Sequence, residues 1–126
     1  MDLETLKRLL QKSWTQESAC GLWDPKQKSL NQCEPTILLV QDELGGRILE
    51  RKISSGETLF YLNELPDGSL VDLCRHDIEI TIKLHVLGMS ACDRETLLQD
   101  EEIKTRYEVL KKNFETNKAQ FSTPVI

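Results

Sequence analysis

Cys33 is the residue whose type and position best suit chemistry. It begins a segment, 33–44, in which Pro35 suits a first helical turn and Glu34 suits the positive end of a helix dipole. A thiol at a helix start is favoured as a thiolate by the dipole and by unpaired backbone amides, and the same amides can receive an oxyanion. The alternative interpretation is a small buried core residue that happens to begin a helix. Position alone leaves both interpretations open.

Partners for such a thiol are scarce. His76 and His85 are the only histidines in the sequence, although most acid–base and metal chemistry uses this residue type. The other cysteines, Cys20, Cys74 and Cys92, are widely spaced and form no C-x-x-C pair, which excludes a zinc ribbon and a thioredoxin-type motif. The sequence also lacks a P-loop, a G-x-G-x-x-G turn, an H-E-x-x-H helix and an EF-hand loop. We therefore expect no cofactor and no bound metal.

The composition is that of one soluble globular domain, 1–126. Hydrophobic residues make up 39% of the chain and charged residues 29%, which is typical of a protein with a real core. Acidic residues number 21 against 16 basic ones, and the net charge of −5 argues against a nucleic-acid partner. No apolar run approaches the length of a membrane span, and the acidic N-terminus lacks the apolar stretch of a signal peptide. We therefore expect a cytoplasmic protein with free thiols and no membrane contact.

Apolar periodicity indicates the elements that must position these residues. Spacings of three and four predict helices near both ends of the chain and after Cys33, whereas alternation in the middle predicts strands. Gly45-Gly46 ends the helix that begins at Cys33, since glycine accepts the left-handed conformation of a helix cap, and Asp100 caps the last long helix. The order of helix, helix, strands and helix indicates an α+β fold. The predicted bounds are 1–19 for the N-terminal helix, 33–44 for the Cys-bearing helix, 47–86 for an antiparallel sheet with strands near 47–53, 58–65, 70–74 and 78–84, 93–118 for a C-terminal helical segment, and 119–126 for a fraying tail.

Five motifs occur in order between residues 13 and 110. They are Ser13-Trp14-Thr15-Gln16-Glu17-Ser18-Ala19, Trp23 followed by Asn31-Gln32-Cys33-Glu34-Pro35-Thr36, Val40-Gln41-Asp42 with Gly45-Gly46-Arg47-Ile48-Leu49, Phe60-Tyr61-Leu62-Asn63-Glu64-Leu65-Pro66-Asp67-Gly68 followed by Val71-Asp72-Leu73, and Arg94 with Leu97-Leu98 and Arg106-Tyr107. The series resembles that of the YunG family of small bacterial proteins. The corresponding patterns of that family read S-W-S-x-E-T-A, G-Q-C-A-V-T, V-Q-D-x-x-G-G-x-I-L, H-Y-W-N-x-L-P-D-G, and R-x-x-L-L with R-Y.

The resemblance implies a compact papain-like or transglutaminase-like fold, in which a cysteine begins a helix packed on an antiparallel sheet. It implies that Cys33 is the nucleophile, that Asp72 is the third member of a triad, and that Gln32 or the helix-start amides receive the oxyanion. The histidine position is Phe60, which we expect to face Cys33 from a strand beside that of Asp72. A phenyl ring can neither take the thiol proton nor protonate a leaving group. The glycine before Gln32 is also replaced, by Asn31.

Two functions are consistent with these residues. The first, which Phe60 favours, is a catalytically degenerate papain-like module that binds an unknown protein or small-molecule partner, because a triad without its base loses most of its rate. In that case Cys33 is a neutral thiol at pH 7 and reacts no faster than an ordinary exposed cysteine. The alternative is a cysteine hydrolase or acyltransferase, in which Cys33 attacks an amide or thioester carbonyl and His76 or His85 is a relocated base. The surroundings of the Cys33 sulfur decide between them.

Overall fold

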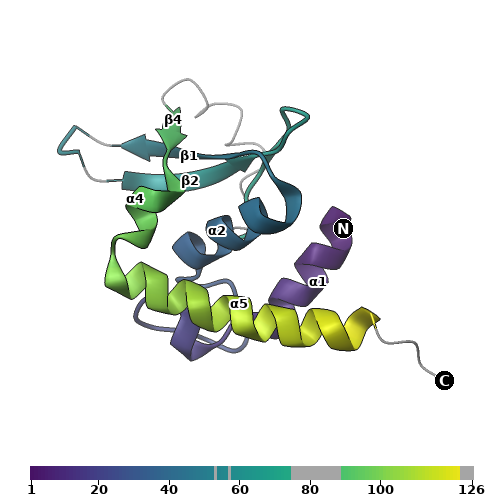
Figure 1. Cartoon of the computed structure of the whole chain (residues 1–126). Coiled ribbons are helices and arrows are strands. Elements are labelled where there is room, and N and C mark those ends of the chain that lie inside the picture. The colour runs from purple at the N-terminus through teal and green to yellow at the C-terminus, as the bar shows by residue number, and fades with distance from the viewer. Residues whose placement is uncertain (53, 57, 75–88, 123–126) are drawn as a thin grey trace.

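In the described part of the chain, helices precede and follow an antiparallel sheet (Figure 1). The computed structural model describes residues 1–52, 54–56, 58–74 and 89–122. The helices are α1 (Leu3–Ser13), η1 (Gln16–Ser18), α2 (Cys33–Leu44), α4 (Arg94–Leu98) and α5 (Glu101–Ser122), and the strands are β1 (Arg47–Lys52), β2 (Thr58–Glu64), β3 (Leu70–Val71) and β4 (Met89–Cys92). The predicted α+β class, with an antiparallel sheet and a C-terminal helix, is confirmed.

The first helix is shorter than the predicted segment, 1–19. α1 ends at Ser13 because Trp14 adopts an extended backbone. The Thr15 N–H then bonds to the Ser18 hydroxyl oxygen at 3.0 Å, and the Ser18 N–H bonds to the Thr15 carbonyl at 3.2 Å. These reciprocal bonds open the separate turn η1, so the prediction of one helix up to residue 19 is wrong. The apolar stripe predicted for the first helix is confirmed, because Leu6, Leu10 and Trp14 are buried.

The central pair of strands is the part of the sheet that the sequence predicts best. Gly46 precedes β1 with a φ of 82°, and a Cβ at this position would overlap the Glu64 carbonyl oxygen, so only glycine fits. β1 and β2 then pair antiparallel, with Leu49 opposite Leu62. The full strand order is β3-β2-β1-β4, and each neighbouring pair is antiparallel.

The two edge strands depart from the prediction. The strand expected at 70–74 contains only Leu70–Val71, because the Asp72 carboxylate accepts a hydrogen bond from the Cys74 N–H at 2.9 Å and folds the backbone into a local turn. The strand expected at 78–84 lies outside the described residues. The opposite edge is formed by β4, which the sequence analysis did not predict and which extends the sheet beyond residue 86.

The two faces of the sheet have different neighbours. α2 packs on one face, where Ile48 meets Ile37 and where the Asn63 side-chain amide donates to the Ile37 carbonyl at 3.0 Å. Successive side chains of a strand point to opposite faces. The other face therefore carries a separate apolar cluster of Leu49, Phe60 and Leu62, with Leu70 and Met89 packed against it. Figure 1 shows α2 between the sheet and the layer formed by α1 and α5.

The longest helix, α5, covers the side of α2 that faces away from the sheet. It begins after the predicted cap, Asp100, whose carboxylate accepts hydrogen bonds from the backbone of its first turn. The helix continues past the predicted end at residue 118 and into the predicted tail, because residues 101–123 contain no glycine or proline. Neither α5 nor any other helix of the described residues is long and apolar enough to cross a membrane. Leu110 and Phe114 of α5 are fully buried against α1 and α2.

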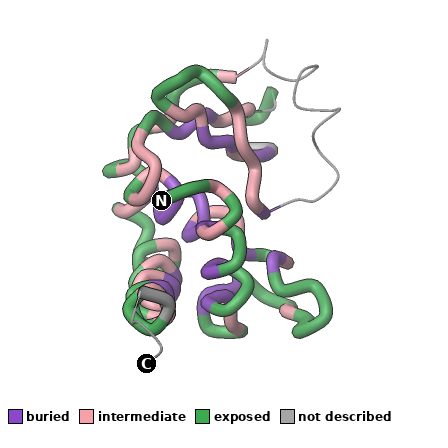
Figure 2. The backbone as a smooth tube through the Cα atoms, turned by 90° about the vertical axis from the view of Figure 1, so that its right-hand side faces the viewer, coloured by how far each residue is buried: buried purple, intermediate pink, exposed green. Residues whose placement is uncertain are grey.

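Side-chain amides tie α5 to the end of α1. Asn113 Nδ2 donates to the Ser13 carbonyl at 3.1 Å, and Asn117 Nδ2 donates to Ser13 Oγ at 3.0 Å. Figure 2 shows buried positions along the strands and on the helices beneath them, whereas the loop after η1 is largely exposed. The helices α1 and α5, from opposite ends of the sequence, therefore form one layer. The loop that leads to Cys33 begins at this layer.

Candidate functional site

Cys33 is the first residue of α2, and its half-buried side chain packs beside the apolar cluster between α2 and the sheet. This confirms the prediction that Cys33 begins a helix packed on an antiparallel sheet. Pro35 has no N–H, and the Thr36 N–H bonds to the Gln32 carbonyl at 3.1 Å. The N–H groups of Cys33 and Glu34 remain open, since no described residue accepts a hydrogen bond from them. The helix start thus offers two donors close to the thiol.

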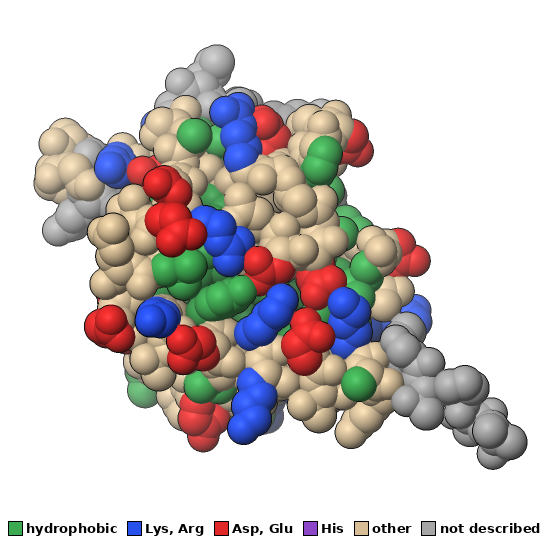
Figure 3. Space-filling model, in the orientation of Figure 1, with side chains coloured by type: hydrophobic (Ala, Val, Ile, Leu, Met, Phe, Trp, Pro, Cys, Tyr) green, Lys and Arg blue, Asp and Glu red, His purple; other side chains and the backbone are tan. Residues whose placement is uncertain are grey.

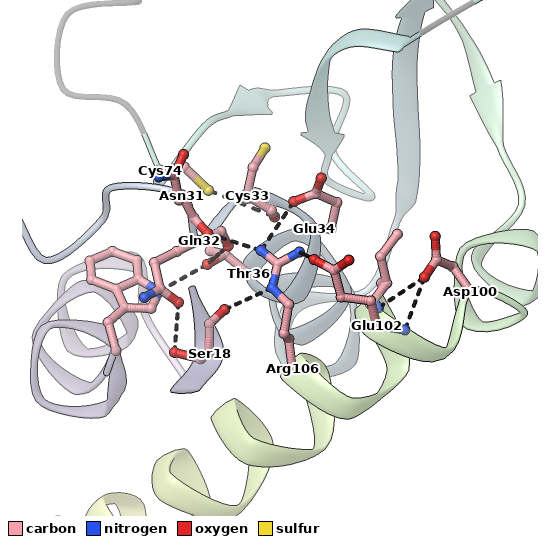
Figure 4. Close-up of polar contacts among 12 residues, drawn as sticks. Ser18, Asn31, Gln32, Cys33, Glu34, Thr36, Cys74, Asp100, Glu102 and Arg106 are labelled. Carbon is pink, nitrogen blue, oxygen red and sulfur yellow. Dashed lines mark hydrogen bonds and ion pairs between the residues drawn. The ribbon is translucent and has the colours of Figure 1, made fainter. Parts of the chain in front are cut away.

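A hydrogen-bond network fixes the first turn of α2 (Figure 4). The Trp14 indole N–H donates to Thr36 Oγ1 at 2.9 Å, and the Thr36 hydroxyl donates to the Gln32 carbonyl at 2.6 Å. The Ser18 hydroxyl donates to Gln32 Oε1 at 2.7 Å, and Gln32 Nε2 donates to the Thr15 carbonyl at 2.8 Å. Residues of the first two motifs therefore bind one another and set the direction in which α2 starts.

The same bonds revise the role expected for Gln32. Its carboxamide is fully buried and directed at Ser18 and Thr15, away from the Cys33 sulfur (Figure 4). A side chain held this way positions the helix start rather than receiving an oxyanion. Of the two oxyanion donors considered, the open amides of Cys33 and Glu34 are the ones that the geometry favours.

The backbone conformation of Asn31 explains why asparagine can replace the glycine that the family pattern has before Gln32. Its φ is 58°, in the left-handed region, where glycine is easiest and asparagine is the next most tolerated residue type. Its side-chain amide donates to the Leu22 carbonyl at 2.6 Å, and its own carbonyl accepts from the Cys20 N–H at 2.8 Å. The replacement therefore keeps the backbone conformation that brings the loop into α2.

Arg106 of α5 holds the loop that precedes α2, a role that the sequence analysis missed. Its guanidinium is almost fully buried and donates to the Ser18 carbonyl at 3.1 Å and to the Asn31 carbonyl at 2.9 Å. Glu34 Oε2 lies 3.4 Å from the same guanidinium. A buried cation is stable only when it is paired and hydrogen-bonded. The signal in the sequence was the Arg106-Tyr107 motif, although its spacing from Cys33 could not show the contact.

Within the described part of the chain, a second cysteine, Cys74, lies against Cys33, and the sequence analysis did not place it at the site. Cys74 is buried, and its thiol donates a hydrogen bond to the Cys33 carbonyl oxygen at 3.8 Å. The neighbouring Cys33 side chain and burial raise the pKa of the Cys74 thiol well above its usual value, and the nearby Asp72 charge adds to the shift. Cys74 therefore keeps its proton at neutral pH.

Asp72 lies just beyond β3, on the segment that brings Cys74 to Cys33. Its carboxylate caps the Cys74 N–H at 2.9 Å, so the structure brings it beside the second thiol. The described residues contain no group of three or more His, Cys, Asp or Glu side chains arranged to hold a metal ion. Of the expected site residues, Cys33 and Asp72 are thus linked through Cys74, which contacts both of them.

Phe60 does not face Cys33, and that prediction is wrong. Phe60 lies on the face of the sheet opposite α2, in the cluster with Leu62, whereas its neighbour Tyr61 packs on the α2 side near Cys33. Because side chains alternate along a strand, a difference of one residue changes the face. A histidine at position 60 would also point away from the thiol. The candidate substitutes His76 and His85 lie outside the described residues.

The model of the YunG protein family matches residues 2–119. The chain belongs to the YunG family. No curated protein and no solved structure matches the chain.

Residues of two further YunG motifs, Val40-Gln41-Asp42 and Arg94 with Tyr107, meet at the other end of α2. Arg94 Nη1 lies 2.9 Å from Asp42 Oδ1 and donates to Gln41 Oε1 at the same distance. The Tyr107 hydroxyl donates to Asp42, and the Lys111 ammonium lies 3.3 Å from Asp42 Oδ2. Burial and the Asp42 carboxylate raise the pKa of Tyr107 to about 12. Figure 3 shows acidic and basic side chains intermixed on this face of the molecule.

Proposed function

We propose that this YunG protein is a papain-like module that binds a protein partner beside the start of α2 and does not turn over a substrate. The observation that carries the proposal is the neighbour of the Cys33 thiol. A general base must accept a proton in the transition state, and Cys74 is a thiol that keeps its own proton. The papain-like assignment is supported by the cysteine that opens a helix packed on an antiparallel sheet.

The surface that we assign to the partner is the loop between Ala19 and Gln32. Leu22 on this loop is 85% exposed, while the loop around it is ordered by its own hydrogen bonds. Trp23 Nε1 donates to the Lys28 carbonyl at 2.9 Å, and Asn31 donates to the Leu22 carbonyl. A rigid loop that presents an apolar side chain loses little conformational entropy on binding. This favours a partner protein with an apolar contact site.

Affinity capture with four baits tests the proposal. Wild type and Cys33→Ala should retain the same partner, because binding does not need the thiol. Leu22→Ser should weaken retention by about tenfold or more, and the exposed control Lys104→Ser should not. Loss of the partner with Cys33→Ala alone, or equal loss with the control, would contradict the proposal.

A cysteine hydrolase or acyltransferase is the second candidate. The observation that favours it is the pair of open N–H groups at Cys33 and Glu34, which suit the oxygen of a tetrahedral intermediate. Its base would be His76 or His85. Activated esters and thioesters are the probes: a burst of product that disappears in Cys33→Ala and in only one of His76→Ala and His85→Ala would establish this function. The binding module should show no Cys33-dependent burst and ordinary alkylation of Cys33 by iodoacetamide.

A further inference from the structure

We propose that Cys33 and Cys74 form a dithiol site that a peroxide closes to a disulfide. The two residues are separated by 41 positions in the sequence. Nevertheless, the Cys74 sulfur lies 3.8 Å from the Cys33 carbonyl oxygen, so the fold brings the two cysteines into contact. A disulfide needs the two cysteines close together before reaction, and the fold supplies that proximity. The site requires neither a base nor a partner and is therefore independent of the proposed function.

Both cysteines are held by their surroundings. The network of Trp14, Thr36 and Gln32 fixes the turn from which Cys33 projects. On the other side, the Asp72 carboxylate holds the Cys74 N–H at 2.9 Å. Figure 4 shows the Cys74 sulfur directed at the backbone of Cys33. Closing the disulfide therefore takes side-chain rotation rather than a search by two loose segments.

The exposure of the two thiols assigns their roles. Cys33 is half-buried and reachable from solvent, whereas Cys74 is buried. The Cys33 thiolate attacks one oxygen of hydrogen peroxide, the O–O bond breaks, and Cys33 becomes a sulfenic acid while hydroxide leaves. The Cys74 sulfur then attacks the Cys33 sulfur; the sulfenic oxygen leaves with the Cys74 proton as water. Each sulfur loses one electron overall, and the peroxide gains two.

The disulfide would join the start of α2 to the segment after β3. It would also remove the Cys33 thiol from any alkylating reagent, while the mild reductant dithiothreitol would restore it. Without Cys74, the Cys33 sulfenic acid has no partner and proceeds to sulfinic acid under excess peroxide. Cys74 therefore acts as the resolving thiol, and its loss should make oxidation of Cys33 irreversible.

The test uses the full chain with Cys20→Ser and Cys92→Ser, treated with hydrogen peroxide. We expect a mass lower by two hydrogen atoms, a Cys33–Cys74 crosslinked peptide, and full recovery of both thiols with dithiothreitol. Adding Cys74→Ser should leave Cys33 with extra oxygen atoms and no crosslink. Oxygen addition at Cys33 without a crosslink in the protein that retains both cysteines would overturn the proposal.

The complementary protein, Cys33→Ser with Cys74→Ser, is the matched control. It retains Cys20, which adjoins Glu102 of α5, and Cys92, which adjoins Glu50 of β1. Because Cys20 and Cys92 have separate surroundings, a disulfide between them should form at least about tenfold more slowly than the Cys33–Cys74 disulfide forms in the protein with Cys20→Ser and Cys92→Ser. Equal rates would show that chain motion, rather than the fold, brings thiols together. Circular dichroism of every variant confirms that the rates refer to folded protein.

Discussion

The two ends of α2 are built in opposite ways. At its N-terminal end, two amides have no acceptor among the described residues, and the Cys74 sulfur lies 3.8 Å from the Cys33 carbonyl oxygen. At its C-terminal end, Asp42 is held by cations from α4 and α5, and Lys118 lies 3.2 Å from Glu43. A helix C-terminus repels carboxylates through its dipole, so these acids are stable there because cations surround them.

This difference separates stability from reactivity along one helix. At the C-terminal end, Asp42 and Glu43 each lie within 4.0 Å of two cations. The N-terminal end has a rigid frame beneath it but open donors and a reachable thiol at its tip. A helix that is locked at one end can therefore present chemistry at the other without becoming mobile.

The largest effect should come from removing the frame beneath Cys33. Trp14→Ala should lower the free energy of unfolding by about 3–5 kcal/mol, because it deletes a buried ring. It should also speed alkylation of Cys33, since Thr36 loses its donor and the turn loosens. Urea denaturation and iodoacetamide rates measure both effects. Trp14→Phe, which keeps an aromatic ring without the indole N–H, should cost less, and equal costs would contradict a role for the hydrogen bond.

Breaking the locked end should cost less and leave the thiol unaffected. Arg94→Ala should lower the free energy of unfolding by about 1–2 kcal/mol, because it removes charged hydrogen bonds that solvent partly screens. The exposed control Arg8→Ala should change stability by less than about 0.5 kcal/mol. Cys33 alkylation should keep the wild-type rate; an altered rate would show that the two ends are coupled.

Alkaline pH should weaken the locked end selectively. The pKa of Tyr107 is raised to about 12 from 10.0 in the native state, so between these values the unfolded state loses the phenolic proton first. Stability from this group is therefore present below pH 10 and is lost as the pH rises towards 12. The midpoint of urea denaturation should fall more steeply with pH in wild type than in Tyr107→Phe. Parallel curves would contradict the raised value.

The smallest effect should come from the loop residue before α2. Asn31→Gly should change the free energy of unfolding by less than about 0.5 kcal/mol, because glycine accepts a φ of 58° without strain and offsets the lost amide bond. Asn31→Ala should cost about 1 kcal/mol or slightly more, since alanine resists the left-handed conformation. Thermal denaturation distinguishes the two, and equal effects would show that the side-chain hydrogen bond dominates.

Local signals predicted local structure well. Pro35 and Gly45-Gly46 fixed α2 within the sequence itself, because a proline in the first turn and glycines after the last turn act on their own backbone. Asp100 marked the start of α5 for the same reason. The part of the site that depends only on the start of a helix, Cys33 with its open amides, was therefore predictable.

The rest of the site depends on contacts between distant segments. The face on which Phe60 lies follows from the register of β2 and from the face that α2 covers, and neither is written in a short motif. Cys74 reaches Cys33 through the return of the chain after β2, across 41 positions. The role expected for Gln32 came from the family resemblance, whereas its bonds to Ser18 and Thr15 depend on where α1 ends.

The bonds from α5 to the first part of the chain also have a kinetic consequence. Asn113 closes on Ser13 across 100 positions, and Arg106 closes on Ser18 across 88. Contacts of such high sequence separation form late, because the closure entropy of the long loop must be overcome before they add stability. We therefore expect Cys33 to behave as an ordinary chain thiol during folding until α5 docks, so that its environment in the native state is among the last features to form.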